Sequence, residues 1–270
     1  MGIAAMNAAA TGMKALDTKL NVVANNLANV NTTGFKRSRT NFEDLMYQVR
    51  REPGSRDFED RPTPHGIQVG LGVAVSGTQL NFENGSIDPS GRKLDLAIQG
   101  EGFFQVLTTY NGQQLTAYTR AGNLVRNANG ELVLGNSIGS ILDPPITIPE
   151  NVPDDGIVIN NNGLVQVRED GSSELTEVGQ LELARFVNPE GLKSIGKNLY
   201  VETDASGTPI TGEPLQDGMG EIMQGMLENS NVEPVRELVD LIMTQRGFEL
   251  NSQSIQSADE ALRVVTNLRR

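Results

Sequence analysis

The chain has 270 residues, of which 34 are acidic and 22 basic, so its formal net charge is −12. It has no cysteine and one histidine, His65, which excludes disulfides, thiolate chemistry and metal sites built on two histidines. The negative charge argues against nucleic acid as a partner, because a phosphate backbone needs a clustered basic surface. With 4% aromatic residues, stacking on sugars or bases is disfavoured as well. We therefore expect no catalytic residues, no cofactor and no metal.

The N-terminal residues show no recognisable targeting signal. Its first residues lack a basic start followed by an unbroken apolar core, so they do not resemble a cleavable secretory signal. No apolar run approaches the roughly 20 residues that span a bilayer. We expect a soluble chain that is either cytoplasmic or exported by a route that does not read a cleavable signal.

The N-terminal segment has the apolar spacing of a helix. Its apolar residues follow one another at alternating steps of three and four. They are Met6, Ala9, Met13, Leu16, Leu20, Val23, Leu27 and Val30. This seam predicts a helix over about residues 3–30, which ends where polar turn formers precede Gly34, a residue suited to a C-cap.

A second helix is predicted over about residues 232–268. Asn231 or Glu233 suits its N-cap, and Pro234 suits its first turn. Its apolar seam consists of Leu241, Phe248, Ile255, Ala258, Leu262 and Val265. A second apolar set is expected beside the seam, at Val235, Val239, Ile242, Val264 and Leu268. The helix thus carries more apolar surface than one partner helix would cover.

The middle of the chain is predicted to be β. Apolar residues alternate strictly within residues 66–77, and short apolar runs follow at 94–98, 102–108, 131–134, 156–159, 163–167, 180–186 and 198–202. Turn signals separate the runs, at Asn84-Gly85, Asn111-Gly112, Asn129-Gly130, Asn162-Gly163 and Pro189-Glu190-Gly191. Short strands joined by such turns indicate an antiparallel barrel or sandwich.

These segments predict an α+β fold in three parts. Residues 1–34 with 228–270 are expected to form a coiled-coil stalk of antiparallel helices, residues 35–66 an extended linker, and residues 67–227 a β-rich domain. A stalk with two weak seams is marginal in water, so its uncovered stripe would pack on neighbouring copies. The alternative is that both helices pack on the β domain of their own chain.

Several long segments resemble a known family. The segment 25–48, NNLANVNTTGFKRSRTNFEDLMYQ, closely resembles the signature of the bacterial flagellar rod and hook family. The segments 94–106 and 118–133 resemble the family's central motif, and the segment 227–268 resembles its terminal helix. Because these motifs coincide in the expected order, the resemblance is far more specific than a short pattern.

Within the family, chain length and the runs 66–73 and 180–200 resemble the members of the distal rod most closely. The resemblance implies a structural subunit that polymerises helically into a hollow drive shaft, with terminal helices in an inner coiled-coil layer and the β domain outside. That shaft transmits torque from motor to hook and forms the export channel. The resemblance also implies a place in the basal body, across the periplasm, reached by export without a cleavable signal.

The partners implied by the resemblance are further copies of the chain, proximal rod proteins, the hook protein, the P-ring and L-ring proteins, the rod cap and the type III flagellar export apparatus. The predicted assembly interface is the seam residues Met13, Leu16, Leu20, Val23, Leu27, Val30, Leu241, Phe248, Ile255, Ala258, Leu262 and Val265. A register or packing role is expected for Asn25, Asn26, Asn29, Asn31, Gly34 and Phe35. Alternatively, the asparagines of the helix are simply exposed to solvent.

Other polar features favour ordinary structural roles. His65 follows Pro-Thr-Pro and is expected in an exposed loop rather than in a pH-sensitive contact. Residues 127–131 are expected to form a turn rather than a calcium loop, because the ligand spacing is incomplete. Asp154 and Asp155 are expected on a solvated face rather than as a catalytic pair.

Two rival functions remain open at this point. One is an enzyme or carbohydrate-binding domain that acts on peptidoglycan, which would show a cleft with perturbed carboxylates or exposed aromatic side chains. The other is a different axial protein of the same family, from the proximal rod or a short hook. Straight filaments would favour the distal rod, and curved tubes would favour a hook.

Overall fold

The computed structural model describes residues 2–54, 64–168 and 174–268. The chain divides into two compact units, each assembled from separate stretches: Met1–Ala28, Ser38–Leu80 and Glu233–Arg270 in the first, Asn29–Arg37 and Asn81–Val232 in the second. Strand pairings in the described parts are antiparallel, so the fold is α+β. Neither described helix has the length and apolar character that crossing a bilayer requires.

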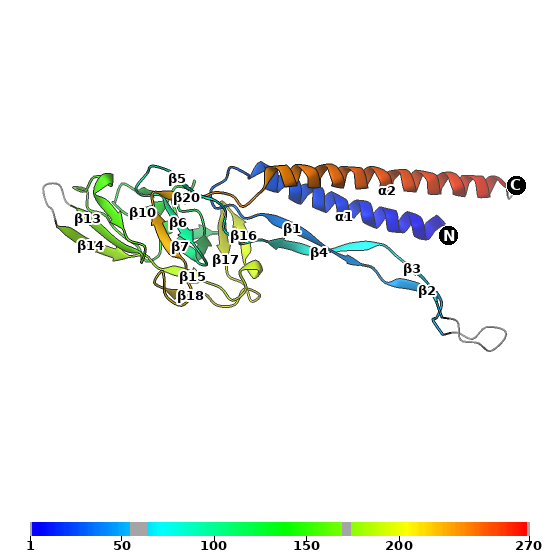
Figure 1. Cartoon of the computed structure of the whole chain (residues 1–270), viewed down its shortest axis with the longest axis horizontal. Helices are drawn as coiled ribbons and strands as arrows, with labels where there is room; N and C mark the ends of the chain where they lie inside the picture. Colours follow the sequence, from blue (N-terminus) through cyan, green and yellow to red (C-terminus); the bar gives the residue numbers. More distant parts are fainter. Residues whose placement is uncertain (1, 55–63, 169–173, 269–270) are drawn as a thin grey trace. The chain divides into compact units, whose positions relative to one another are not determined.

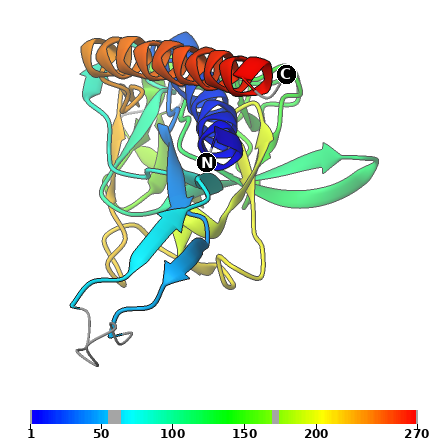
Figure 2. The same cartoon turned by 90° about the vertical axis from the view of Figure 1, so that its right-hand side faces the viewer.

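The first unit contains the two helices and a two-stranded ribbon (Figures 1 and 2). The helices are α1 (Gly2–Ala28) and α2 (Pro234–Leu268). In the ribbon, β1 (Ser38–Asp44) pairs with β4 (Val73–Leu80), and β2 (Tyr47–Arg51) pairs with β3 (Ile67–Gly70). Backbone hydrogen bonds from Leu45 N to Gly72 O (2.9 Å) and from Leu71 N to Met46 O (3.2 Å) make the two pairs continuous.

Both predicted helices are confirmed, with shifted ends. α1 ends at Ala28, and residues 29–34 form turns before the ribbon. Gly34 is therefore not the C-cap of α1. It has φ +68°, and a side chain there would meet the backbone of Arg120 and Ala121 (2.7 Å to Ala121 N). The glycine is needed for close approach of two chain segments and for a left-handed backbone.

The second unit is built from short antiparallel strands. Its largest sheet has nine strands, in which β16, β17, β8, β7, β11, β10 and β9 follow one another and β15 pairs with both β7 and β18. Three smaller sheets pair β12–β13–β14, β6 with β19, and β5 with β20. The strands are β5 (Ile87–Pro89), β6 (Leu96–Gln99), β7 (Phe103–Tyr110), β8 (Gln113–Thr119), β9 (Leu124–Arg126), β10 (Leu132–Leu134), β11 (Ile141–Leu142), β12 (Ile157–Ile159), β13 (Leu164–Arg168), β14 (Leu175–Gln180), β15 (Leu183–Arg185), β16 (Lys193–Gly196), β17 (Leu199–Val201), β18 (Ile210–Gly212), β19 (Glu221–Gln224) and β20 (Met226–Glu228).

The core of this unit is aliphatic with one aromatic cluster. Buried leucine, isoleucine and valine side chains from β6, β7, β10, β12, β13 and β15 form one continuous cluster. Beside it, Phe103 meets Phe82 and Phe186 edge to face, with ring centroids 5.3 and 5.9 Å away, and Tyr118 meets Phe186 at 4.8 Å. Seven of the predicted apolar runs correspond to strands β6, β7, β10, β12, β13, β15 and β17.

The observed units divide the chain differently from the expected domains. Residues 38–80 belong to the first unit, although residues 35–66 were expected to be a linker and residues 67–80 part of the β domain. The reason is the pairing of β1 with β4, which brings a polar strand from the expected linker onto the alternating run. That ribbon packs on α1, where Thr11 Oγ1 accepts a hydrogen bond from Val73 N (3.3 Å).

Candidate functional site

The two helices of the first unit pack on each other and run in opposite directions. Leu16 lies against Gly247, where an added Cβ would be 3.2 Å from Leu16 Cδ1. Lys19 Nζ lies 3.9 Å from Asp240 Oδ1. Later positions of α1 therefore face earlier positions of α2, as expected for an antiparallel pair, and the missing side chain at Gly247 lets the helices come close.

The predicted seam residues are only partly covered within the subunit. On α1, Val23 is buried. The half-buried seam residues are Met13, Leu16, Leu20, Leu27, Leu241, Ile255, Ala258 and Leu262, with Val30 in the turn after α1. Phe248 is 41% exposed, and the side chain of Val265 lies outside the described residues. The seam therefore joins the two helices while leaving part of its surface accessible.

A second apolar surface lies on the other side of α2. At 100° per residue, its seven exposed residues fall within an arc of about 140°, centred nearly opposite the seam rather than beside it. This outer face consists of Val235, Leu238, Val239, Ile242, Met243, Leu250 and Val264. Val235 and Met243 are 75% and 68% exposed. Its first part, from Val235 to Met243, is a contiguous apolar patch of the kind typical of a protein–protein contact, whereas farther along α2 exposed polar residues share the arc. The side chain of Leu268, expected in this set, lies outside the described residues.

Asn26 is buried and bonds within its own unit. Its Nδ2 donates to Ser38 O (2.8 Å) and to Glu237 Oε2 (3.2 Å), and its Oδ1 accepts from Ser38 N (3.0 Å). It thus joins the end of α1 to the starts of β1 and α2. Of the other predicted register residues, Asn25 and Asn31 are exposed, Asn29 and Phe35 are half-buried, and Gly34 is buried.

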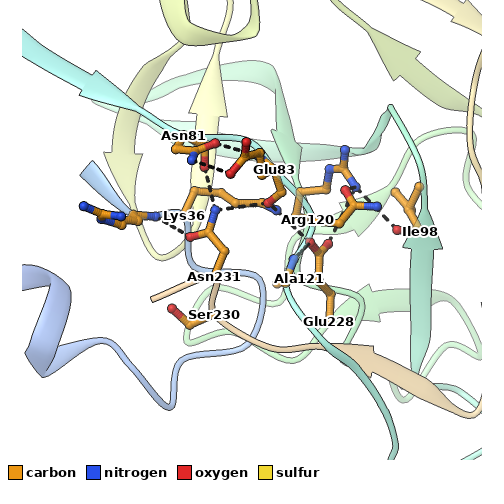
Figure 3. Close-up of polar contacts among 12 residues, drawn as sticks. Lys36, Asn81, Glu83, Ile98, Arg120, Ala121, Glu228, Ser230 and Asn231 are labelled. Carbon is orange, nitrogen blue, oxygen red and sulfur yellow. Dashed lines mark hydrogen bonds and ion pairs between the residues drawn. The ribbon is translucent and has the colours of Figure 1, made fainter. Parts of the chain in front are cut away.

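The second unit contains a buried charge cluster, which we call the connector cluster, made of Lys36, Arg120, Glu228 and Asn231 (Figure 3). Lys36 Nζ lies 2.6 Å from Glu228 Oε1 and donates to Glu83 O at 2.7 Å. Arg120 Nη1 lies 3.6 Å from Glu228 Oε2. Lys36 and Glu228 are fully buried and Arg120 is 3% exposed, so two buried cations share one buried carboxylate.

Backbone groups form hydrogen bonds with both Glu228 and Arg120. Gly85 N donates to Glu228 Oε1 (3.0 Å), and Gly34 N donates to Glu228 O (2.8 Å). Arg120 Nη2 donates to Gly100 O (2.9 Å), and the guanidinium carbon lies 5.1 Å from the centre of the Phe103 ring. Hydrogen bonds and the ring face compensate part of the cost of burying the charges.

Asn231 connects the points at which the chain passes between the units. Its Nδ2 donates to Asn81 O (2.9 Å) and Glu83 O (3.0 Å), and its Oδ1 accepts from Arg37 N (2.7 Å). Arg37 and Asn81 are the residues of the second unit next to Ser38 and Leu80. Asn231 is therefore not the N-cap of α2; of the two candidates from the sequence, Glu233 is the one that directly precedes Pro234. The Asn231 side chain fixes three segments of the second unit to one another.

Burial perturbs the titration of the cluster and its neighbours. Desolvation lowers the pKa of Lys36 to about 8, against the opposing effect of Glu228, and the nearby Arg120 lowers it further. Burial also lowers the pKa of Arg120. The pKa of Tyr200 is raised to about 12, mainly by burial.

The other polar features occupy ordinary structural positions. His65 is exposed. Asn127 Oδ1 accepts from Asn129 N and Glu131 N, both at 2.9 Å, as in a turn. Asp154 lies 3.8 Å from Arg126. No cluster of three potential ligands suited to a metal ion occurs in residues 2–54, 64–168 and 174–268.

The connector cluster was missed from the sequence. Lys36, Arg120 and Glu228 each stand in a segment that carries the family resemblance: TTGFKR, YTRAG and LENSN. The signal available in the sequence was that each of these segments has a charged residue close to glycine, aromatic or asparagine residues. Their separation by up to 192 positions hid the fact that they meet.

Comparison with known proteins gives three matches along the chain. Residues 6–36 match the flagella basal body rod protein family, residues 97–167 the flagellar hook protein FlgE/F/G D1 domain, and residues 223–268 the flagellar basal body rod FlgEFG protein C-terminal family. The matched stretches contain α1 with the segment after it, much of the β-rich unit, and α2.

Full-length relatives extend these matches. The flagellar basal-body rod protein FlgG of Borreliella burgdorferi is 43% identical over 97% of both chains. That of Caulobacter vibrioides is 43% identical over 98% of this chain and 99% of the relative, and that of Bacillus subtilis 37% identical over 96% and 97%. The crystal structure of the Helicobacter pylori flagellar hook protein FlgE2 is 17% identical, covers 72% of this chain and 43% of that chain, and gives a TM-score of 0.24, too low to support an argument.

The chain belongs to the flagellar basal-body rod protein family. Within that family, the relatives that match it from end to end at 41–43% identity bear the name FlgG.

Proposed function

We propose that the chain is a structural subunit of the flagellar distal rod, which polymerises helically into a hollow shaft that carries torque from motor to hook and encloses the export channel. The similarity to FlgG proteins over nearly the whole chain supports this assignment. A structural role also agrees with a family of rod proteins rather than enzymes.

The observation that carries the polymerisation is the outer face of α2. Seven apolar side chains on one side of this helix are at least 45% exposed, while the opposite side packs on α1. Burial of apolar surface contributes about 25 cal/mol per Å², so contact with the helices of neighbouring copies would stabilise the assembly. Copies joined head to tail without closing a ring form a filament. In that filament, the helices would form an inner coiled-coil layer around the channel, and the β strands of the second unit a barrel-like outer domain.

The proposal extends to location and partners. The subunit would leave the cell unfolded through the type III flagellar export apparatus and assemble in the basal body, across the periplasm, beneath a rod cap. Proximal rod proteins and the hook protein would contact the two ends of the shaft, and the P-ring and L-ring proteins would surround it. The seam residues and the asparagines after residue 24 would then lie near contacts between subunits.

The test is assembly of the purified full-length chain at high concentration. Electron microscopy should show straight filaments for the natural chain and none for Ile242→Asp, which places a charge in the outer face. Gln245→Glu, at an exposed position of α2 that lies about 20° outside the arc of that face, is the matched control and should assemble.

Assembly of Ile242→Asp to the same extent as the control would contradict the proposal. Curved tubes from the natural chain would favour the alternative of another axial protein. A specific observation keeps that alternative in view: the flagellar hook-basal body complex protein FlhP of Bacillus subtilis is 32% identical over 98% of this chain.

A further inference from the structure

The segment 226–232, which we call the strap, is the last part of the second unit before α2. Its strand β20 pairs with β5, and Asn229 N donates to Ser86 O (2.8 Å). The buried side chains of the strap are Glu228 and, at its last residue, Val232, while the residues between and before them are half-buried. Hydrogen bonds and one carboxylate therefore hold this segment in place together with a single buried apolar side chain.

The carboxylate of the strap meets cations from two distant parts of the chain (Figure 3). Lys36 belongs to the segment after α1, and Arg120 follows β8. When the strap detaches, Lys36 keeps its hydrogen bond to Glu83 O, and Arg120 keeps Ile98 O, Gly100 O and the Phe103 ring. A buried charge without its partner is strongly unfavourable, so the charge of Glu228 opposes detachment.

A steric detail shows how closely the strap fits its seat. An added Cβ at Gly85 would overlap with the carbonyl oxygen of Asn229. The same Gly85 donates its N–H to Glu228 Oε1 (3.0 Å). The seat at residues 83–86 is thus shaped for the attached strap, independently of charge.

We propose that residues 226–232 form a closing strap that opens and closes as one cooperative segment while the sheets of the second unit stay folded, and that the charge of Glu228 sets how often it opens. Local opening of this kind is common where apolar burial is small. For a chain exported unfolded, a use that rests on the function proposed above, the second unit would be completed only once residues 226–232 have reached it.

The test is hydrogen exchange of the full-length monomer, resolved to single amides. Glu228→Gln keeps the shape of the side chain and an oxygen for Gly85 N but removes the charge. Exchange at Gly34, Gly85 and Asn229 should become about 100-fold to 1,000-fold faster, the range expected for a broken buried pair. Exchange in the centre of β7 and β8 is the reference, and in both the natural chain and Glu228→Gln it should be at least about tenfold slower than at these three amides.

Two further variants separate charge from shape. Gly85→Ala leaves all charges in place and disturbs the seat, so Gly34 and Asn229 should again exchange faster than in the natural chain and at least about tenfold faster than the centre of β7 and β8. Asp154→Asn is the charge control, because it removes a carboxylate from a partly exposed pair with Arg126 (3.8 Å). Exposed pairs contribute about 0–1 kcal/mol, so exchange at the strap should stay within about fivefold.

Either of two results would overturn the proposal: unchanged exchange at the strap in Glu228→Gln, or equal exchange rates at the strap and in the centre of β7 and β8 in both proteins, which would mean that the unit opens only as a whole. Should Glu228→Gln fail to fold, the same two criteria applied to Gly85→Ala decide the matter. The measurement uses the monomer, so its failure leaves the assembly experiment with Ile242→Asp untouched.

Discussion

The connector cluster predicts an unequal response to loss of its two partners. Glu228 is shared by two cations, whereas Lys36 is one of two cations that face the same carboxylate. We expect Glu228→Gln to destabilise the second unit more than Lys36→Met, which keeps the apolar stem of the side chain. A simple one-to-one ion pair would give similar losses for both variants.

The magnitudes follow from what each variant leaves behind. Glu228→Gln leaves Lys36 and Arg120, 0% and 3% exposed, without their nearest counter-charge, which costs about 4 kcal/mol. Lys36→Met leaves a carboxylate that keeps Arg120 at 3.6 Å and Gly85 N at 3.0 Å, so the loss should be about 2 kcal/mol. The double variant leaves Arg120 alone and should cost no more than Glu228→Gln, a coupling of about 2 kcal/mol.

Urea unfolding followed by tyrosine near-UV circular dichroism measures these losses. The chain has no tryptophan and four tyrosines, of which Tyr110, Tyr118 and Tyr200 lie in the second unit. The same cycle on Arg185 and Glu101, whose side chains are 39% and 70% exposed, is the control and should give less than about 1 kcal/mol. Equal losses for the two single variants, or additive losses in the double variant, would refute the shared-anion arrangement.

Three more predictions concern single sites. Gly34→Ala should cost at least about 1–3 kcal/mol by thermal unfolding, because φ is +68° and Ala121 N is 2.7 Å from the added Cβ; an unchanged midpoint would contradict that geometry. Asn26→Ala should cost about 2–3 kcal/mol, since it removes the bonds to Ser38 N and O, and far-UV circular dichroism should show α1 and α2 melting earlier than in Asn25→Ala. Burial raises the pKa of Tyr118 and of Tyr200 from 10.0 to about 12; the folded state holds these protons more tightly, so their contribution to stability is complete below pH 10 and is lost as the pH rises through about 12. Tyrosine absorbance should show two groups that ionise near pH 12, and titration of all four near pH 10 in the folded state would contradict the burial.

Local patterns predicted most of the secondary structure. The steps of three and four in the first 30 residues and the heptads after Leu241 correspond to α1 and α2. Asn111-Gly112 forms the turn of the β7–β8 hairpin with φ of 50° and 79°, the left-handed values that favour this dipeptide. These features depend on neighbours in the sequence, which is why they could be read from it.

The ribbon shows where local patterns are insufficient. β1 has the sequence SRTNFED, which carries too few apolar residues to predict a strand, and its partner β4 begins at Val73. Its register is set by pairing across the chain and by packing on α1. Because a two-stranded ribbon is marginal alone, context supplies the stability that the residues of β1 do not.

The connector cluster depends entirely on distant partners, and its chemistry explains why polar rather than apolar residues occupy it. Three segments of the second unit, ending at Arg37, beginning at Asn81 and ending at Val232, adjoin the first unit in sequence. Each brings backbone N–H and C=O groups inside, and these must be paired. The side chains of Asn231 and Glu228 pair with N–H groups of Arg37 and Gly85, which an apolar side chain could not do. An apolar replacement could recover the stability of the ion pairs, but it would leave these backbone groups unsatisfied and the relative register of the three segments unspecified.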